Sequence, residues 1–181
     1  AKYDDVSGYS EPSESAHDFF CIGHTSTSVS LACGLAKARD LADENYNVIA
    51  VIGDGSLSGG EALEGLDFAK ELNGNLIVVV NDNEMSIAEN HGGLYENLKL
   101  LRDTKGQAEC NIFKAMGLNY VFVEDGNDLT QLIDAFKRVK DSKAPVAVHI
   151  HTLKGKGYTL AEENKESWHW HMPFDIETGK T

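Results

Sequence analysis

Two groups of polar residues interrupt the apolar runs of this sequence, and their residue types are those that bind a metal ion and a phosphate. Gly53-Asp54-Gly55 follows the apolar run 48–52, and Asn81-Asp82-Asn83 follows the apolar run 76–80. A helical pattern separates the two runs, so the stretch 48–83 predicts a β-strand, a helix and a second, parallel strand. Ligands of such units bind beyond the carboxyl ends of the strands. Both polar groups are therefore expected to lie side by side at one edge of a sheet.

The chemistry expected at that edge is binding of Mg²⁺ together with a diphosphate. Asp54 and Asn83 offer hard oxygen ligands, and a backbone carbonyl with phosphate oxygens would complete the coordination. The glycines beside Asp54 permit close backbone approach, and the amides at the start of the next helix favour an anion. Taken alone, Gly-Asp-Gly is just as typical of an ordinary strand-to-turn connection. The second polar group is what favours the metal site.

The rest of the sequence predicts the elements that position this edge. Ser58 and Glu61 have the spacing of a capping box, which predicts a helix start at Ser58. The order of elements predicts an α/β domain with a mostly parallel sheet. Residues 1–20 and 162–181 lack a periodic pattern and are expected to be extended or loop-like. Helices are predicted over 29–41, 58–72, 94–101, 108–116 and 128–140, and strands over 48–52, 76–80, 120–123 and 146–151.

Composition limits the classes of partner. The net charge of −13, from 16 basic and 29 acidic residues, argues against a nucleic-acid partner and against an anionic membrane surface. No run reaches transmembrane length, and no signal-peptide pattern opens the chain. The cysteines Cys21, Cys33 and Cys110 share no CxxC spacing, which is typical of a reduced, cytoplasmic protein. We expect Cys21 and Cys33 to be packing residues. The start at Ala1 indicates a piece of a longer protein.

Four segments, in this order, resemble the 1-deoxy-D-xylulose-5-phosphate synthase family of thiamine-diphosphate-dependent, transketolase-like enzymes. They are GHTSTS (23–28), GDGSLSGG (53–60), NDNEMSI (81–87) and KGKGY (154–158). The resemblance spans nearly the whole chain and implies one three-layer thiamine-diphosphate-binding domain over 1–181. It further implies Mg²⁺ as a second cofactor and a homodimer. The implied reaction joins pyruvate to glyceraldehyde 3-phosphate with loss of CO₂, on the route to isoprenoids and thiamine.

The resemblance also implies roles for individual residues. The metal ligands would be Asp54, Asn83 and the backbone carbonyl of Met85. Two histidines of the tail, His169 and His171, are alternatives for one catalytic role near the substrate, and His24 is the other catalytic candidate. The expected cofactor-binding residues are Gly23, His24, Ser26, Thr27, Gly53, Asp54, Gly55, Ser56, Asn83, Met85 and Lys154.

Other interpretations stay open at this point. In the family, the glutamate that activates the aminopyrimidine ring belongs to a second, pyrimidine-binding domain, so this chain alone is expected to lack a complete active site. One alternative is the corresponding subunit of a split transketolase, which transfers two-carbon units between sugar phosphates. Another is an association module that has lost cofactor binding. His24 could simply cap the helix after it, and Trp168 and Trp170 could anchor the tail or, as we favour, contact a partner chain.

Overall fold

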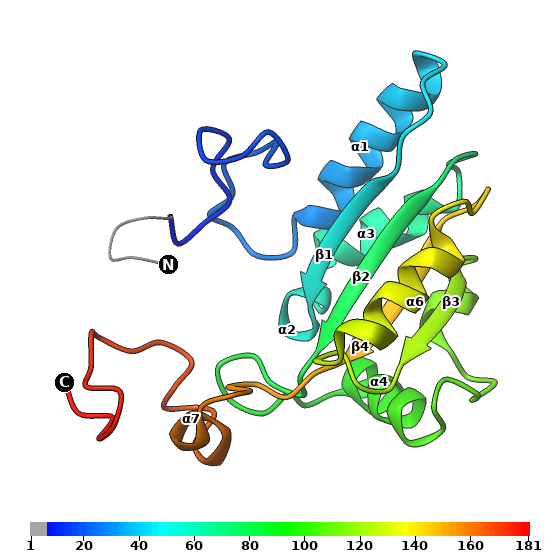
Figure 1. Ribbon diagram of the computed structural model, residues 1–181. Helices are drawn as coiled ribbons and strands as arrows, with labels where there is room; N and C mark the ends of the chain where they lie inside the picture. Colours follow the sequence, from blue (N-terminus) through cyan, green and yellow to red (C-terminus); the bar gives the residue numbers. More distant parts are fainter. Residues whose placement is uncertain (1–6) are drawn as a thin grey trace.

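A four-stranded, all-parallel sheet forms the centre of the fold (Figure 1). The computed structural model describes residues 7–181. Its strands stand in the order β1-β2-β4-β3, which confirms the predicted parallel sheet and all four predicted strands. Three strands are longer than predicted, because β1 continues into Gly53, β2 continues into Asp82 and β3 begins at Asn119. The strands are β1 (Val48–Gly53), β2 (Leu76–Asp82), β3 (Asn119–Val123) and β4 (Val146–His151).

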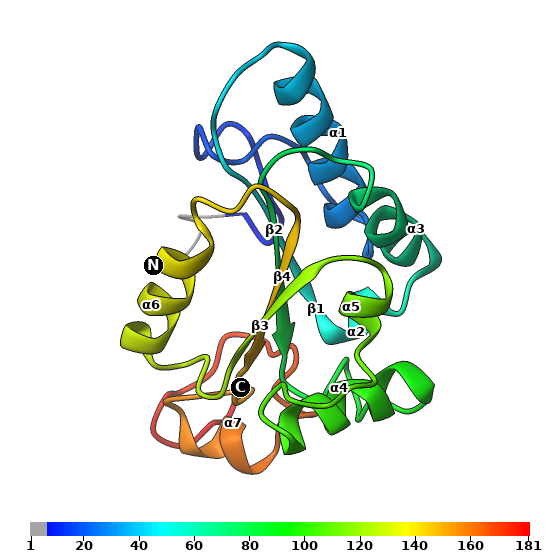
Figure 2. The same cartoon turned by 90° about the vertical axis from the view of Figure 1, so that its right-hand side faces the viewer.

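Helices cover both faces of the sheet, which makes three layers (Figure 2). One face carries α1 (Ser28–Leu41), α3 (Gly60–Ala69) and the single turn α5 (Ile112–Ala115), and the other carries α6 (Leu129–Val139). The helices α4 (Gly93–Asp103) and α7 (Thr159–Glu163) lie near the end toward which the strands run (Figure 1). Loops at that end therefore have helices beside them.

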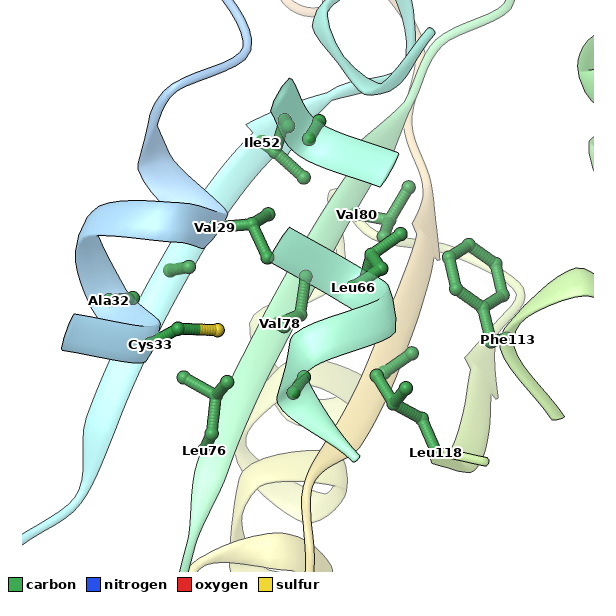
Figure 3. Close-up of a cluster of buried hydrophobic side chains, with 14 of the residues drawn as sticks. Val29, Ala32, Cys33, Ile52, Leu66, Leu76, Val78, Val80, Phe113 and Leu118 are labelled. Atoms are coloured by element: carbon green, nitrogen blue, oxygen red, sulfur yellow. The ribbon is translucent and has the colours of Figure 1, made fainter. Parts of the chain in front are cut away.

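Alternate residues of β2 enter two separate cores. Leu76, Val78 and Val80 belong to the core beneath α1 and α3 (Figure 3), whereas Ile77 and Val79 belong to the core beneath α6. A strand that is buried on both faces has no polar side to present, which is why it forms a continuous apolar run in the sequence. This central strand delivers Asn81 and Asp82 to the carboxyl edge of the sheet.

The helix predicted over 58–72 is different in the structure. A short helix, α2 (Asp54–Leu57), follows β1 directly, and α3 begins only at Gly60. The predicted capping box does not form, because Gly59 is the N-cap and Ser58 Oγ donates to the Gly55 carbonyl instead (3.0 Å). A Cβ on Gly59 would lie 1.9 Å from Ser26 Oγ, so packing against the loop before α1 selects glycine there.

Other boundaries shift less. The helix predicted over 108–116 is only α5, because the Asn111 side chain caps it by accepting from the amides of Phe113 (3.0 Å) and Lys114 (3.2 Å). The helix α7 was not predicted, and it includes residues 162 and 163 of the tail that we expected to be loop-like. Residues 164–181 contain no helix or strand, as expected. Residues 7–20 form only turns and bends, and residues 1–6 of the predicted extended start lie outside the described part.

Two expectations from composition have clear outcomes. Cys33 is buried, as predicted, but Cys21 is exposed, so its assignment as a packing residue is wrong. Its thiol lies on the surface near the Glu11 carboxylate. Across residues 7–181, none of the helices has the length and apolar character needed to cross a membrane.

Candidate functional site

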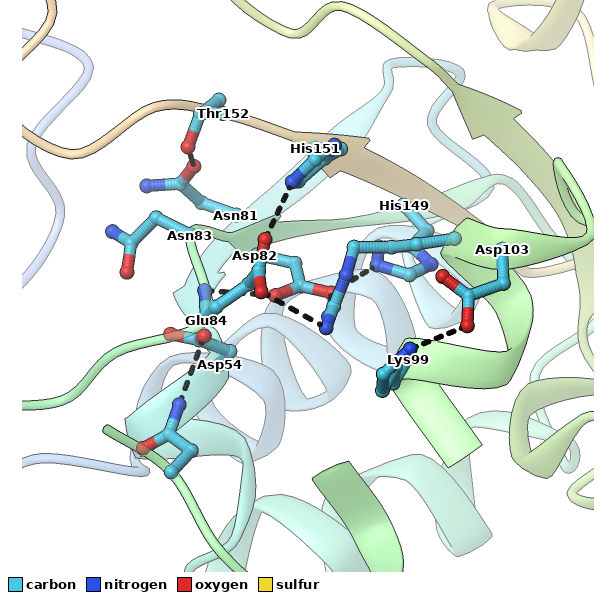
Figure 4. Close-up of polar contacts among 12 residues, drawn as sticks. Asp54, Asn81, Asp82, Asn83, Glu84, Lys99, Asp103, His149, His151 and Thr152 are labelled. Atoms are coloured by element: carbon cyan, nitrogen blue, oxygen red, sulfur yellow. Dashed lines mark hydrogen bonds and ion pairs between the residues drawn. The ribbon is translucent and has the colours of Figure 1, made fainter. Parts of the chain in front are cut away.

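The two polar groups lie side by side at the carboxyl edge of the sheet, as predicted. Gly53 is in register with Asn81 across β1 and β2, so the residues that follow leave the sheet at the same edge. Figure 4 shows Asp54, Asp82 and Asn83 at this edge, with side chains of β4 beside them. The parallel pairing of the two strands is what brings distant parts of the sequence together here.

Asp54 is a buried carboxylate, with 2% of its surface exposed. One carboxylate oxygen accepts from the Gly55 amide and the other from the Asn90 side-chain amide, both at 2.9 Å. Burial, and next the negative charge of Asp82, raise the pKa of Asp54 to about 6. A divalent cation would relieve both effects, so the local electrostatics favour a metal ligand at this position.

A tight turn carries the other two predicted metal ligands. Asn83 Oδ1 accepts from the Met85 amide and Asp82 Oδ1 accepts from the Glu84 amide, each at 3.1 Å. Glu84 has a φ of +69°, a conformation that side chains other than glycine seldom adopt. The turn therefore depends on these two side-chain bonds.

The donor set suits Mg²⁺, because a carboxylate, an amide oxygen and a backbone carbonyl are all hard oxygen ligands. Side chains alone do not complete the site: residues 7–181 contain no cluster of three or more His, Cys, Asp and Glu that could hold a metal. Asp54 and Met85 line one cavity of about 360 Å³, whereas Asn83 lines a neighbouring hollow with Lys154. The structure thus places the ligands at adjacent strand ends but not within one cavity.

The segment 23–28 packs directly against α2. Ser26 Oγ donates to the Ser56 carbonyl (2.7 Å), and the Thr25 and Ser56 hydroxyls are 2.5 Å apart. Two predicted cofactor residues are thereby in contact. His24 is exposed just before α1, whose N-cap residue is Thr27, so His24 does not cap that helix.

Lys154 links the loop after β4 to the loop after β2. Its ammonium donates to the Ser86 carbonyl (2.6 Å) and to His169 Nδ1 (3.0 Å). Partial burial lowers the pKa of Lys154, while the negative charge of Asp54 acts in the opposite direction. The structure therefore brings Lys154 and His169 together at this edge. Their roles toward cofactor and substrate stay predictions.

His171 lies in a different environment from His169. Its ring stacks on Trp168, with centroids 4.3 Å apart, and Tyr158 and Phe174 complete the aromatic cluster. Trp168 thus packs within the tail, as in the anchor alternative, whereas Trp170 is exposed over 72% of its surface. The partner contact that we favoured for these tryptophans stays a prediction.

Several residues at the edge were not predicted. Asn90 bonds Asp54, and Ser86 Oγ donates to Asn90 Oδ1 (2.6 Å). Behind them, the buried Asp82 contacts His149 of β4 and Arg102 of α4. One signal was present in the sequence: His149 is a polar residue within the apolar run of β4, where burial requires a hydrogen-bond partner.

A parallel sheet makes the chain an α/β protein, and its polar groups lie at the carboxyl edge, where proteins of this class bind ligands. The family model described as 1-deoxy-D-xylulose-5-phosphate synthase matches residues 1–111 and 102–152. The chain therefore belongs to this family, in agreement with the resemblance of its four motifs.

Curated relatives carry the same description. The chain is 40% identical to 1-deoxy-D-xylulose-5-phosphate synthase of Pelotomaculum thermopropionicum, over 97% of the chain and 33% of the relative. It is 41% identical to 1-deoxy-D-xylulose-5-phosphate synthase 1 of Geobacter metallireducens, over 97% of the chain and 34% of the relative. The Listeria monocytogenes enzyme is 40% identical over 96% of the chain and 30% of its own length. The chain spans about a third of the length of these relatives.

Replacing Asp54 by Asn is expected to stabilise the metal-free protein at neutral pH. A carboxyl whose folded pKa lies at about 6, above its unfolded value of about 4, destabilises the fold as pH rises between these values. Asp54→Asn should therefore raise the free energy of unfolding by about 1–3 kcal/mol at pH 7 and by nothing below about pH 4. Urea unfolding in EDTA at both pH values measures this, with the exposed Asp67→Asn as control. A gain independent of pH would contradict it.

Glycine is required at position 55 but not at position 53. A Cβ on Gly55 would lie 2.1 Å from Ser86 Oγ, whereas a Cβ on Gly53 would meet nothing within 4 Å. Gly55→Ala should displace the Ser86 loop and lower the free energy of unfolding by about 1–3 kcal/mol. The melting temperature should then fall by several degrees. Gly53→Ala is the matched control, and Gly55→Ala combined with Ser86→Gly should recover most of the loss. Equal melting temperatures for the two alanine variants would count against this packing.

Proposed function

We propose that this chain forms the Mg²⁺- and diphosphate-binding side of the thiamine diphosphate site in a 1-deoxy-D-xylulose-5-phosphate synthase. That enzyme would join pyruvate to glyceraldehyde 3-phosphate with release of CO₂. The observation that carries the proposal is the buried Asp54, held between two glycines beside the Asn81–Asn83 strand end, in a chain of this family. Because the chain spans about a third of its relatives, the proposal includes a complementary pyrimidine-binding domain and a homodimer.

Three oxygens of this chain would hold the metal ion. The Asp54 carboxylate carries the charge, and Asn83 Oδ1 and the Met85 carbonyl add neutral oxygens. Asn83 Oδ1 already accepts from the Met85 amide, but an amide oxygen has two lone pairs, so a second remains for a metal.

Backbone and side chains near α2 would border the diphosphate. Gly53, Gly55 and Ser56 surround Asp54, and Ser26 holds Ser56 in place through its carbonyl. Lys154 would contribute a cation from the opposite side, because its ammonium already reaches the loop after β2. This lysine would supply local positive charge to an anion in a chain whose net charge is −13.

Histidines would handle protons at the substrate side. When bound, thiamine diphosphate supplies the nucleophilic thiazolium carbon, which no side chain can replace. His169 Nδ1 accepts from the Lys154 ammonium, which places the proton of the neutral ring on Nε2, so this N–H can donate at the substrate. His24, exposed on the loop before α1, is the second candidate for this work.

The metal assignment is tested in the longer enzyme that contains this chain. Asp54→Ala should weaken thiamine diphosphate binding in the presence of Mg²⁺ on the order of 100-fold, because the one charged metal ligand is lost. Calorimetry measures this, with Asp67→Asn as control. Pyruvate-dependent consumption of glyceraldehyde 3-phosphate should fall in parallel.

Two results would contradict the proposal. Binding that survives Asp54→Ala would remove the metal assignment. An unmodified enzyme that transfers two-carbon units between sugar phosphates, and does not release CO₂ from pyruvate, would establish a transketolase instead.

The two tail histidines should differ in the kind of defect that their loss causes. His169→Gln is expected to lower turnover roughly 100-fold with little change in melting temperature, because it removes a proton carrier at the edge. His171→Gln should instead destabilise the tail by about 1 kcal/mol, because it removes a ring stacked on Trp168. Steady-state kinetics and thermal unfolding of both variants separate the roles. A larger loss of turnover for His171→Gln would reverse the assignment.

A further inference from the structure

Asp82 is the most heavily bonded buried carboxylate at the carboxyl edge, and the proposed metal site does not use it. It is fully buried at the end of β2. Its Oδ2 accepts from Arg102 (2.5 Å) and from His149 Nε2 (2.8 Å), and its Oδ1 accepts from the Glu84 amide. Burial alone would raise the pKa of Asp82, but the hydrogen bonds and charges of His149 and Arg102 hold this pKa at about 2. Asp82 is therefore a fixed, charged acceptor.

The groups that hold Asp82 come from three different elements of the fold. Arg102 belongs to α4 and His149 to β4, and the Tyr120 hydroxyl of β3 lies 2.8 Å from His149 Nδ1. We call Tyr120, His149 and Arg102 the Asp82 clamp. Phe122 lies edge-on to the His149 ring, with centroids 5.2 Å apart, and His149 has no exposed surface. The clamp is thus a connected network with a fully buried histidine at its centre.

The hydrogen bonds assign the proton on the His149 ring. Because a carboxylate can only accept, the bond to Asp82 places a proton on His149 Nε2, and in the neutral ring Nδ1 is then an acceptor. The Tyr120 hydroxyl donates to Nδ1, and Nε2–H donates to Asp82. Tyr120 thereby fixes the tautomer in which His149 can hold Asp82.

Asp82 also fixes the start of the tight turn that carries two of the proposed metal ligands. Its Oδ1 holds the Glu84 amide, and Glu84 has the unfavourable positive φ. On either side of Glu84 lie Asn83 and Met85, two of the three proposed Mg²⁺ ligands. Arg102 also reaches the Glu84 carboxylate, at 3.5 Å. Loss of the clamp would let this turn relax to a less strained shape.

We propose that the Asp82 clamp is a positioning device, which sets Asn83 and Met85 for the metal ion. This inference rests on the proposed function, because it assumes that the turn binds Mg²⁺. A purely structural network exists at the other end of the sheet, where Arg39 donates to the carbonyls of Tyr46 and Asn75. That network holds no proposed ligand, so it provides the matched comparison.

The test uses the full 181-residue chain, labelled with ¹⁵N, and MnCl₂ as the probe without cofactor. Mn²⁺ takes the same hard oxygen ligands as Mg²⁺ and broadens nearby amide signals even when it binds weakly. In the unmodified chain, broadening should centre on the Gly55 and Met85 amides. Tyr120→Phe keeps the ring stacked on Phe113 but removes the hydroxyl, and should raise the apparent Kd for Mn²⁺ roughly 10-fold.

Control variants separate positioning from general stability. Tyr46→Phe removes a tyrosine hydroxyl at the other end of the sheet and should leave the Kd unchanged. Arg102→Met should raise the Kd as Tyr120→Phe does, and Arg102→Lys should restore part of the affinity. Long-range ¹H–¹⁵N spectra should show the Nε2–H tautomer of His149 in the unmodified chain and a mixture in Tyr120→Phe.

The outcomes distinguish this inference from the proposed function. An unchanged Kd in Tyr120→Phe and Arg102→Met would overturn the inference and leave the metal assignment standing. The inference would also be overturned if Mn²⁺ affinity fell only in variants whose melting temperature is lower than that of Tyr46→Phe. A general loss of stability would then explain the lower affinity. Broadening in the unmodified chain that is not centred on Gly55 and Met85, or that persists in Asp54→Ala, would overturn the metal assignment and this inference together.

Discussion

Two buried carboxylates, Asp54 and Asp82, lie at the carboxyl edge of the sheet. The site depends on the difference between the groups that surround them. Asp82 is matched by Arg102 and His149, so its negative charge is permanent. Asp54 accepts hydrogen bonds only from amides, and it lies buried near the negative charge of Asp82. Its ionisation is therefore unfavourable, and a bound cation would offset this cost. Like charges at close range push two pKa values apart. Asp82 thus has a structural role, whereas Asp54 is the carboxylate that we propose as the metal ligand.

The rest of the fold positions these two carboxylates and the groups that contact them. Parallel pairing of β1 with β2 sets Asp54 and the Asn81–Asn83 group at neighbouring strand ends, and β4 on the other side of β2 brings His149 against Asp82. Helix α4 then supplies Arg102 from outside the sheet. Gly55 and Gly59 allow the loops carrying Ser86 and Ser26 to close around α2. Each of these contacts joins segments that are distant in the sequence.

The sequence was sufficient to predict the features that depend on local patterns of residues. The apolar runs predicted β1 and β2, although of these two only the central β2 is buried on both faces, whereas Ile49 and Val51 of the edge strand β1 are exposed. The polar groups after the two runs predicted the edge. The capping box at Ser58 failed, because tertiary contact between Gly59 and Ser26 decided where α3 begins. The Asp82–His149 pair could not be predicted, since its members are 67 residues apart and meet only through strand order. The place of His169 beside Lys154 likewise depends on the path of the tail.

The central claim is that Asp54, and not Asp82, binds the metal. A crystal structure of the enzyme containing this chain, with Mg²⁺ and thiamine diphosphate bound, tests it directly. The account predicts Mg²⁺ at about 2.0–2.1 Å from an Asp54 oxygen, Asn83 Oδ1 and the Met85 carbonyl, with Asp82 still bonded to His149 and Arg102. A metal ion coordinated by Asp82, or one without an Asp54 oxygen among its ligands, would contradict the account.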